Sequence, residues 1–345
     1  MPRTSAQPLA VLGGWVATEL VEVTDDLRAL DRSGRWAVAI DFEGHPVLAR
    51  FARWERRALQ AHEVGPWHPP PADSWRSSLT EQRYTRAVER VRAHIGRGDV
   101  YQANVCRTLR APLDPRADLV ALHARLAAGN PAPHAGALRL PDAHVHVASA
   151  SPELFLSRSG DRVESGPIKG TGATAADLRA KDEAENVMIV DLVRNDLGRV
   201  CRTGSVQVPE LLAVEEHPGL VHLVSRVSGE LRAGVGWSEL LAATFPPGSV
   251  TGAPKLAALD IIGAVENGPR GPYCGAFGWV DADRRRASLA VAIRTFWREK
   301  GPDGPVLAFG TGAGITWGSE AGAEWRETEL KAARLLRLAC EREVP

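Results

Sequence analysis

The sequence predicts an α+β fold built on largely antiparallel sheets. Short stretches in which apolar and polar residues alternate follow one another through tight turns, which is typical of hairpin strands. Between them lie longer stretches whose apolar residues recur every three or four positions, the period of a helix. Because turns rather than crossover helices join most of the strands, we expect antiparallel pairing.

The first part of the chain, up to about residue 74, is irregular and contains one predicted hairpin. Residues 36–40 and 46–51 are its strands, joined by a turn at Gly44. Residues 65–71 include four prolines, and so stiff a segment fits neither a helix nor a central strand. It is the most plausible linker. We therefore divide the chain into an N-terminal segment, residues 1–77, and a main domain, residues 78–345.

The main domain mixes helices and strands. Tyr84, Val88, Val91 and Ile95 follow the helical period, and Gly96 ends that run. Further helices are predicted at residues 119–128, 177–197, 256–265 and 323–340. Strands are predicted at residues 99–105, 144–148, 277–280 and 288–296, and a hairpin at residues 154–156 and 162–164.

Composition and charge exclude several classes of protein. Lysine plus arginine and aspartate plus glutamate both number 42, so nothing favours a nucleic-acid or anionic-membrane partner. The four cysteines lie far apart and form no CxxC pair, which indicates reduced thiols rather than a disulfide frame or a zinc site. The apolar run at residues 9–15 is too short to span a membrane and lacks an export pattern. We expect a soluble cytoplasmic protein.

One lysine is held in an unusual backbone setting. Lys169 lies between Gly166-Pro167 and Gly170, where the glycines allow sharp turns and close approach of a ligand, and the proline fixes the direction of entry. A lysine held in this way is a candidate nucleophile or fixed cation. The simpler alternative is a surface hairpin with a solvated lysine.

Two predicted helices each begin with a pair of acids on one face. Asp182 and Glu185 are three residues apart on the first, and Glu324 and Glu327 on the second. Two carboxylates on each of two helices can build an oxygen-rich Mg²⁺ site. Ordinary solvated helix faces, with acids that suit the N-terminal dipole, would show the same spacing.

Glycine-rich segments suggest an anion site. Residues 309–314 are predicted to expose successive backbone N–H groups in a nest, although the third glycine and following helix of a Rossmann fingerprint are missing. Arg294 and Tyr273 add a guanidinium and a hydroxyl. Together these groups suggest a small substrate that carries carboxylates.

Four motifs resemble the chorismate-utilising enzymes, which include anthranilate, aminodeoxychorismate, isochorismate and salicylate synthases. The motifs lie at residues 167–171, 184–196, 252–255 and 312–314, and the resemblance covers about residues 78–340 in the right order. It implies two stacked, mainly antiparallel sheets flanked by helices, with chorismate and Mg²⁺ bound between them. The main domain would then be the chorismate-binding catalytic domain.

Within this family the pattern is most similar to the aminodeoxychorismate synthase component I branch. Lys169 stands where anthranilate synthases usually carry alanine, and residues 248–255 read Gly-Ser-Val-Thr-Gly-Ala-Pro-Lys, as that branch favours. Isochorismate and salicylate synthases activate water with a lysine at the position of Gln102, and glutamine cannot deprotonate water. An anthranilate-type or other aminating chorismate synthase of a secondary pathway, or a non-catalytic chorismate-binding subunit, stays open as an alternative.

The resemblance also implies a role for each site residue. Lys169 is the expected nucleophile, Glu153 the general acid for the departing C4 hydroxyl, and His222 an aid to proton transfer. Glu185 and Glu327 would bind Mg²⁺ directly, with Asp182 and Glu324 behind water molecules. The expected substrate-binding residues are Gly170, Thr171, Ser249, Tyr273, Arg294, Gly312, Ala313 and Gly314.

The reaction implied by the resemblance needs a nitrogen source. The chain has no glutaminase nucleophile motif and no lyase domain, so we expect it to use free ammonia or ammonia from a glutamine amidotransferase subunit. Residues 1–77 are short compared with the tryptophan-binding half of anthranilate synthases. Feedback inhibition by tryptophan is therefore not expected.

Overall fold

The computed structural model describes residues 7–172, 174, 176, 178, 180–217 and 220–341. Within these residues, hydrogen bonds link eighteen strands into one sheet, and every named pair of strands is antiparallel. The predicted antiparallel α+β fold is confirmed. Among the described residues, none of the helices combines the length and apolar character that crossing a membrane requires.

The sheet is a long strip that can be followed from one end to the other. Each strand in the following order is hydrogen-bonded to the next. The first half of the strip is β12 (Gln207–His217), β13 (Leu220–Glu230), β10 (Arg162–Gly166), β9 (Leu154–Ser159), β16 (Arg286–Val291), β15 (Ala276–Asp281) and β3 (Arg35–Ile40). It continues from β3 to β4 (Pro46–Glu55), β2 (Trp15–Thr24), β1 (Leu9–Leu12), β7 (His134–Leu140), β8 (Val145–Ser151), β17 (Thr295–Gly301), β18 (Gly304–Ile315) and β6 (Gln102–Pro112). β11 (Ile168–Gly172) also pairs with β13, whereas β5 (Arg76–Ser77) and β14 (Gly252–Ala253) pair with β6.

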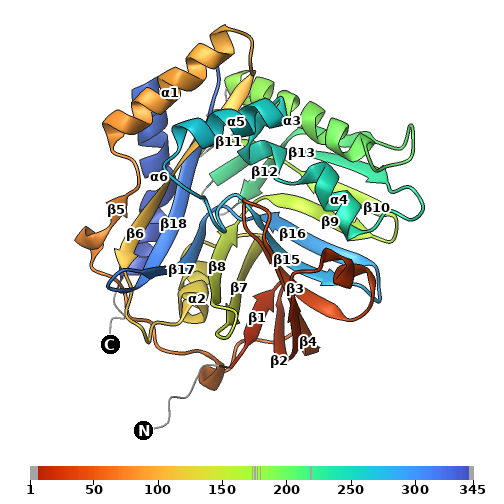
Figure 1. Ribbon diagram of the computed structural model, residues 1–345, viewed down its shortest axis with the longest axis vertical. Coiled ribbons are helices and arrows are strands. Elements are labelled where there is room, and N and C mark those ends of the chain that lie inside the picture. The colour runs from red at the N-terminus through yellow and green to blue at the C-terminus, as the bar shows by residue number, and fades with distance from the viewer. Residues whose placement is uncertain are drawn as a thin grey trace.

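The strip folds back on itself to give two stacked layers. β9, β16, β15 and β3 belong to the first layer, β7, β8, β17 and β18 to the second, and β4, β2 and β1 join them (Figure 1). Trp36 and Phe155 of the first layer share one buried core with Leu138 and Trp297 of the second. The two predicted sheets are therefore stacked, and they are also hydrogen-bonded into one.

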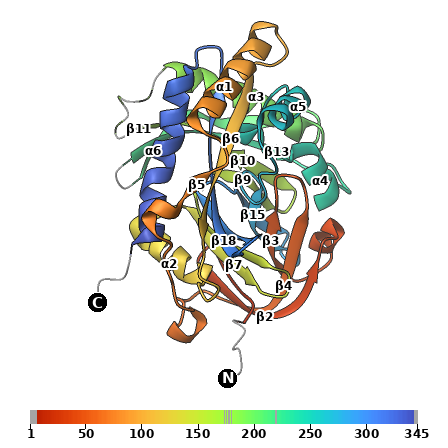
Figure 2. The ribbon, with the colours of Figure 1, turned by 60° about the vertical axis from the view of Figure 1, so that its left-hand side comes forward.

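Helices cover the outer faces of the layers (Figure 2). α1 (Glu81–Gly96), α2 (Leu119–Gly129), α5 (Lys255–Val265) and α6 (Ala321–Cys340) lie over the second layer. α3 (Ala180–Gly198) packs on β13, and α4 (Trp237–Thr244) packs on α3 and on the short 3-10 helix Leu27–Asp31. In α1 the apolar stripe read from the sequence is buried at Tyr84, Val88 and Val91, and the Thr80 side chain caps its first turn. The start predicted for α3, at residue 177, lies outside the described residues.

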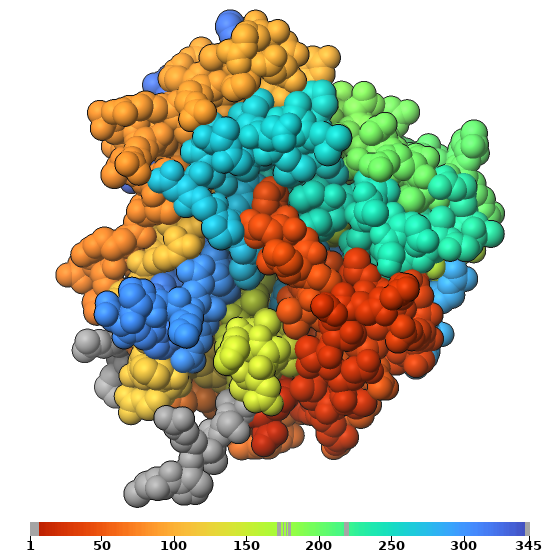
Figure 3. Space-filling view, viewed as in Figure 1, coloured from red at the N-terminus to blue at the C-terminus, as the bar shows by residue number. Residues whose placement is uncertain are grey.

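The N-terminal strands are part of the sheet. β3 pairs with β15 along its length, and the backbone N–H of Trp237 in α4 donates to the Asp31 carboxylate over 2.8 Å. In the space-filling view the red N-terminal segment lies directly against the teal segment that contains α4 (Figure 3). The N-terminal strands β4, β2 and β1 thus connect the two layers of the sheet.

Two local predictions were wrong. The strand expected at residues 288–296 is broken, because β16 pairs with β9 in one layer and β17 with β8 in the other, so the chain crosses between layers. Arg294 lies in this crossing with a φ of 52°. The nest expected at residues 309–314 is instead the end of β18, paired with β6 through Ile315, because glycines there admit close neighbours rather than form a loop.

Gly310 shows how tight this packing is. A methyl group at Gly310 would lie 2.0 Å from Cγ of the buried Tyr273 ring. We expect Gly310→Ala to lower the free energy of unfolding by about 3 kcal/mol, the upper end for overpacking, because the ring is buried. Gly198→Ala, at the end of α3 with nothing within 4 Å, is the matched control and should be neutral or stabilising. Urea denaturation measures both, and equal stabilities would contradict this packing.

Candidate active site

Lys169 lies in a β-bulge at the seam between the sheet and α3. The register of β11 against β13 shifts between Ile168 and Thr171, so Lys169 and Gly170 fall in the irregular part. Gly170 has a φ of 79°, and a methyl group there would lie 2.9 Å from Cβ of Asp182. Only glycine allows both this conformation and this approach. The Lys169 ammonium donates to the Ser249 carbonyl over 3.2 Å.

Glu153 lies where the chain crosses from β8 in one layer to β9 in the other. Its backbone N–H donates to the Ser151 hydroxyl over 3.2 Å, and its carbonyl accepts the Val291 N–H over 3.0 Å. The residue is only 4% exposed. Burial raises the pKa of Glu153 to about 7, although a hydrogen bond with Ser249 and the charge of Lys169 oppose the rise. Its carboxyl can therefore gain or lose a proton near neutral pH.

Lys169 is shifted in the opposite direction. Burial lowers its pKa, against the opposing charges of Glu185 and Glu153. A lysine whose pKa is lowered has a larger fraction of free amine, which is the form that attacks carbon. The two groups thus move together toward a neutral amine beside a protonated acid.

Arg294 belongs to the same group of side chains. Its carbonyl accepts the Ala150 N–H over 3.0 Å, so the crossing that carries Arg294 is tied to the crossing that carries Glu153. Burial lowers the pKa of Arg294, and the Glu153 charge opposes this shift. The structure therefore brings together four of the residues that the sequence analysis singled out: Lys169, Glu153, Ser249 and Arg294.

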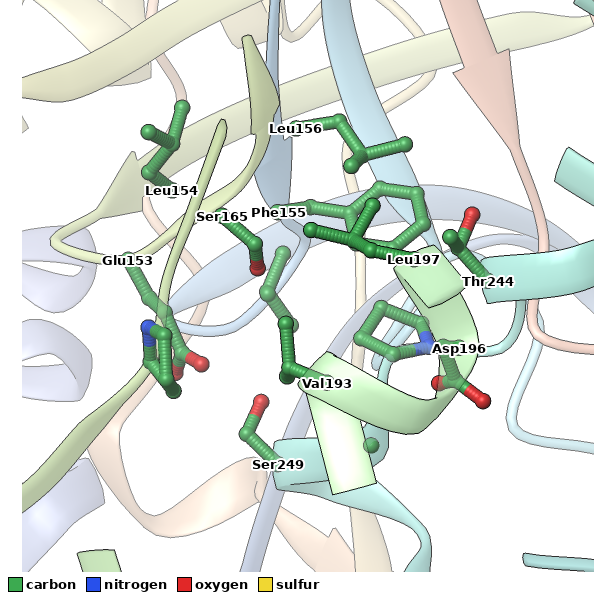
Figure 4. A pocket seen from close by; sticks show the side chains of 14 residues that line it. Glu153, Leu154, Phe155, Leu156, Ser165, Val193, Asp196, Leu197, Thr244 and Ser249 are labelled. Carbon is green, nitrogen blue, oxygen red and sulfur yellow. The ribbon is translucent and has the colours of Figure 1, made fainter. Parts of the chain in front are cut away.

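A small cavity borders this group. The side chains of Glu153 and Ser249 line it together with Val193 and Asp196 of α3 (Figure 4). Its volume of about 20 Å³ admits one water-sized molecule. The cavity therefore suits water or ammonia, and a substrate with a six-membered ring has to bind outside it.

The four predicted metal ligands lie where α3 and α6 meet, but lysines share them. The Lys181 ammonium is 3.2 Å from the Glu324 carboxylate and 3.6 Å from that of Glu185. Lys331 is 2.6 Å from Glu327. Among the described residues, no three potential ligands are arranged to hold a metal ion.

The carboxylates nevertheless fit the chemistry of Mg²⁺. Burial raises the pKa of Glu185, with Lys169 and Lys181 opposing, and the nearby charges of Glu324 and Asp182 add to the rise. Asp182 packs against Gly170 at the start of α3. Acids close enough to repel one another are the donor set that a hard divalent cation prefers.

The remaining predicted residues lie farther into the sheet. His222 is buried on β13, opposite Thr171, whose side chain lies outside the described part of the structure. The Tyr273 ring packs against Gly310 in the core, and burial raises its pKa well above the ordinary value. The last three predicted residues are strand residues that pair with β6: Gly312, Ala313 and Gly314.

Sequence reasoning gave no role to three lysines near the site: Lys181, described above, and Lys331 and Lys255. Lys331 donates to the Gly312 carbonyl over 3.1 Å. Lys255 bonds Asp196 over 2.6 Å and the Thr244 carbonyl over 2.9 Å, which anchors the loop that carries Ser249. Asp196 and Lys255 are the last residues of the motifs at residues 184–196 and 252–255. The sequence therefore drew attention to both residues, but it did not predict that they pair.

The fold and this group of residues agree with what the comparisons show. Residues 16–337 match the chorismate binding enzyme family, so the chain belongs to that family and the predicted resemblance is confirmed. The chain is similar to anthranilate synthase component 1 of Haloarcula marismortui, with 39% identity over 283 residues, which cover 77% of this chain and 56% of that protein. It is also similar to aminodeoxychorismate synthase component 1 of Klebsiella aerogenes, with 37% identity over 320 residues, which cover 87% of this chain and 68% of that protein.

A solved structure supports the fold. The menaquinone-specific isochorismate synthase of Escherichia coli superposes with a TM-score of 0.79 at 17% identity, covering 98% of this chain and 90% of that one. The chain spans about half the length of the anthranilate synthases it matches. The comparisons therefore show the family and the fold, while identity alone does not separate its members.

The raised pKa of Glu153 makes stability depend on pH. Between its ordinary value of 4.5 and about 7, the folded state keeps a proton that the unfolded state has lost. The wild type should therefore lose up to about 3 kcal/mol as pH rises through this window. Glu153→Gln cannot titrate, so we expect its stability relative to wild type to increase from pH 5 to pH 8.

Urea denaturation at pH 5, 6, 7 and 8 measures this difference. Glu216→Gln, which changes an exposed glutamate on β12, serves as the control and should follow the wild type at every pH. A stability difference between Glu153→Gln and wild type that does not change with pH would show that Glu153 titrates normally.

Proposed function

We propose that this protein is the chorismate-aminating component of an aminodeoxychorismate synthase, which converts chorismate and ammonia to 4-amino-4-deoxychorismate for para-aminobenzoate and folate synthesis. The observation that carries the proposal is the proximity of Lys169 and Glu153 at one seam, where burial lowers the pKa of the amine and raises that of the acid. Membership of the chorismate binding enzyme family supports chorismate as the substrate.

The first half of the proposed reaction removes the C4 hydroxyl. The free amine of Lys169 forms a bond to C2 of chorismate, the ring double bonds shift, and the C4–O bond breaks. Glu153 gives its proton to the departing oxygen, which leaves as water. Both groups enter this step in the protonation states that burial favours.

The second half introduces nitrogen. Ammonia forms a bond to C4, the double bonds shift back, and the C2–N bond to Lys169 breaks. The Glu153 carboxylate accepts the proton that ammonia releases, so the acid returns to its starting state. The small cavity beside Glu153 and Ser249 is of the right size for the incoming ammonia.

Charged side chains would orient the substrate. Arg294 and Lys331 would offer cations to the carboxylates of chorismate. We propose that Glu185 and Glu327 bind Mg²⁺ directly, with Asp182 and Glu324 behind water molecules. The ion would supply positive charge for a substrate carboxylate.

Gln102 supports amination rather than hydration. Its side chain is fully buried, and a methyl group at Gly314 would lie 2.5 Å from its Nε2. An amide cannot deprotonate water, whereas ammonia is already a nucleophile. We further propose that a glutamine amidotransferase subunit supplies the ammonia, in keeping with relatives named as component 1.

An anthranilate-type synthase is the second candidate. The observation in its favour is the 39% identity to an anthranilate synthase component 1, slightly above that to the aminodeoxychorismate synthases. The candidates differ in the product, because an anthranilate synthase also eliminates pyruvate. A lysine at position 169 favours the first candidate.

Product analysis separates these candidates. Incubation with chorismate, Mg²⁺ and an ammonium salt at mildly alkaline pH should give aminodeoxychorismate as the main product by liquid chromatography and mass spectrometry. Glutamine in place of the ammonium salt should give no turnover by the isolated chain. Isochorismate, or anthranilate with pyruvate, as the dominant product would overturn the proposal.

Lys169 should carry a covalent intermediate. We expect intact-protein mass spectrometry to find a chorismate-derived adduct on the wild type when ammonia is absent, and none on Lys169→Ala. Binding of chorismate and Mg²⁺ should be largely kept, because Lys169 acts after binding. Lys300→Ala, which removes an exposed lysine of β17, should retain the adduct. An adduct that maps to another residue would show that the nucleophile is misassigned.

A further inference from the structure

Lys181 occupies the junction of α3 and α6. It lies in the first turn of α3, and its ammonium reaches Glu185 one turn later and Glu324 on α6, 143 residues along the chain. The two acid side chains are 13% and 4% exposed, whereas that of Lys181 is 43% exposed. One flexible cation therefore neutralises two largely buried carboxylates.

The position of Lys181 on its helix is unfavourable by itself. The N-terminus of a helix carries a partial positive charge, and acids are the residues that stabilise it. Asp182 and Glu183 in the same turn follow this rule, and Lys181 does not. The unfavourable interaction of Lys181 with the helix N-terminus is offset by its contacts with Glu185 and Glu324, because burial of these carboxylates without a partner is strongly unfavourable. The geometry thus points to a specific role for this charge.

We propose that Lys181 is a resident counter-ion, which holds α3 and α6 together in the metal-free protein and which a divalent cation must displace. This inference rests on the metal site of the proposed function. A cation bound at about 2.1 Å from the same oxygens would be repelled by an ammonium that already contacts them. Lys181 can leave without unfolding the site, because its stem is flexible and half exposed to solvent.

If a divalent cation must displace Lys181, then Lys181 weakens metal binding. The same lysine stabilises the metal-free protein. Two partly exposed ion pairs of ordinary strength correspond to about a three- to tenfold change in affinity. Lys181→Met should therefore bind Mg²⁺ about three- to tenfold more tightly than the wild type. In EDTA the same variant should unfold at a lower temperature, because Glu185 and Glu324 then lose the cation they share and repel each other more strongly.

The test is calorimetric titration of metal-free protein with MgCl₂, together with thermal unfolding in EDTA and in saturating Mg²⁺. Lys181→Met should unfold at a lower temperature than the wild type in EDTA, and this difference in unfolding temperature should disappear in saturating Mg²⁺. Lys181→Arg keeps the charge and should resemble the wild type in both measurements. Lys300→Met, which removes an exposed positive charge on β17, is the matched control and should change neither.

Other results would overturn the inference. Unchanged or weaker Mg²⁺ binding by Lys181→Met, or an unchanged unfolding temperature in EDTA, would show that Lys181 is not a counter-ion that metal displaces. A wild type that binds no Mg²⁺ would overturn it as well. Neither measurement uses chorismate or ammonia, so an error in the assigned product would leave the outcome unaffected and would be recognised separately.

Discussion

Pairing of buried charges is the constraint on which the site depends. Lysines pair with acids at two places where segments distant in the chain come together: Lys181 with Glu324, and Lys255 with Asp196. Both carboxylates are almost fully buried, and a buried carboxylate without a partner would be strongly unfavourable. Each pair therefore fixes the position of one segment, respectively the start of α6 and the loop that carries Ser249.

The folded strip explains why the candidate catalytic groups gather at one seam. Glu153 and Arg294 both lie where the chain leaves one layer for the other, and backbone hydrogen bonds tie these two crossings together. A crossing residue is free from the alternation of a strand, so its side chain can point along the seam between the layers. The same feature that joins the sheets thus places an acid and a guanidinium beside Lys169.

Local patterns in the sequence were enough to predict α1, α2, α3, α5, α6 and the antiparallel class, because the periods of helices such as α1 and α6 are set by neighbours a few residues away. The short helix α4 was not predicted. They could not predict the break at Arg294 or the strand at residues 309–314, since partners from other parts of the chain decide both. The motifs identified Lys169, the spacing of acids on two predicted helices indicated the four carboxylates, and the family resemblance pointed to Glu153. The counter-ions Lys181 and Lys331 remained hidden, because nothing local shows which acid a lysine will meet.

The protonation of Lys169 and Glu153 follows from two opposing effects. Attraction between an ammonium and a carboxylate favours the charged pair, and burial favours the neutral amine beside the neutral acid. Burial is the larger effect for both residues. A substrate that covers the seam excludes more water, which strengthens both the attraction between the ammonium and the carboxylate and the cost of burying their charges. The protonation states of Lys169 and Glu153 then depend on the charges of the substrate. A carboxylate held by Arg294 would draw this cation away from Glu153, and the acid would then be more fully protonated.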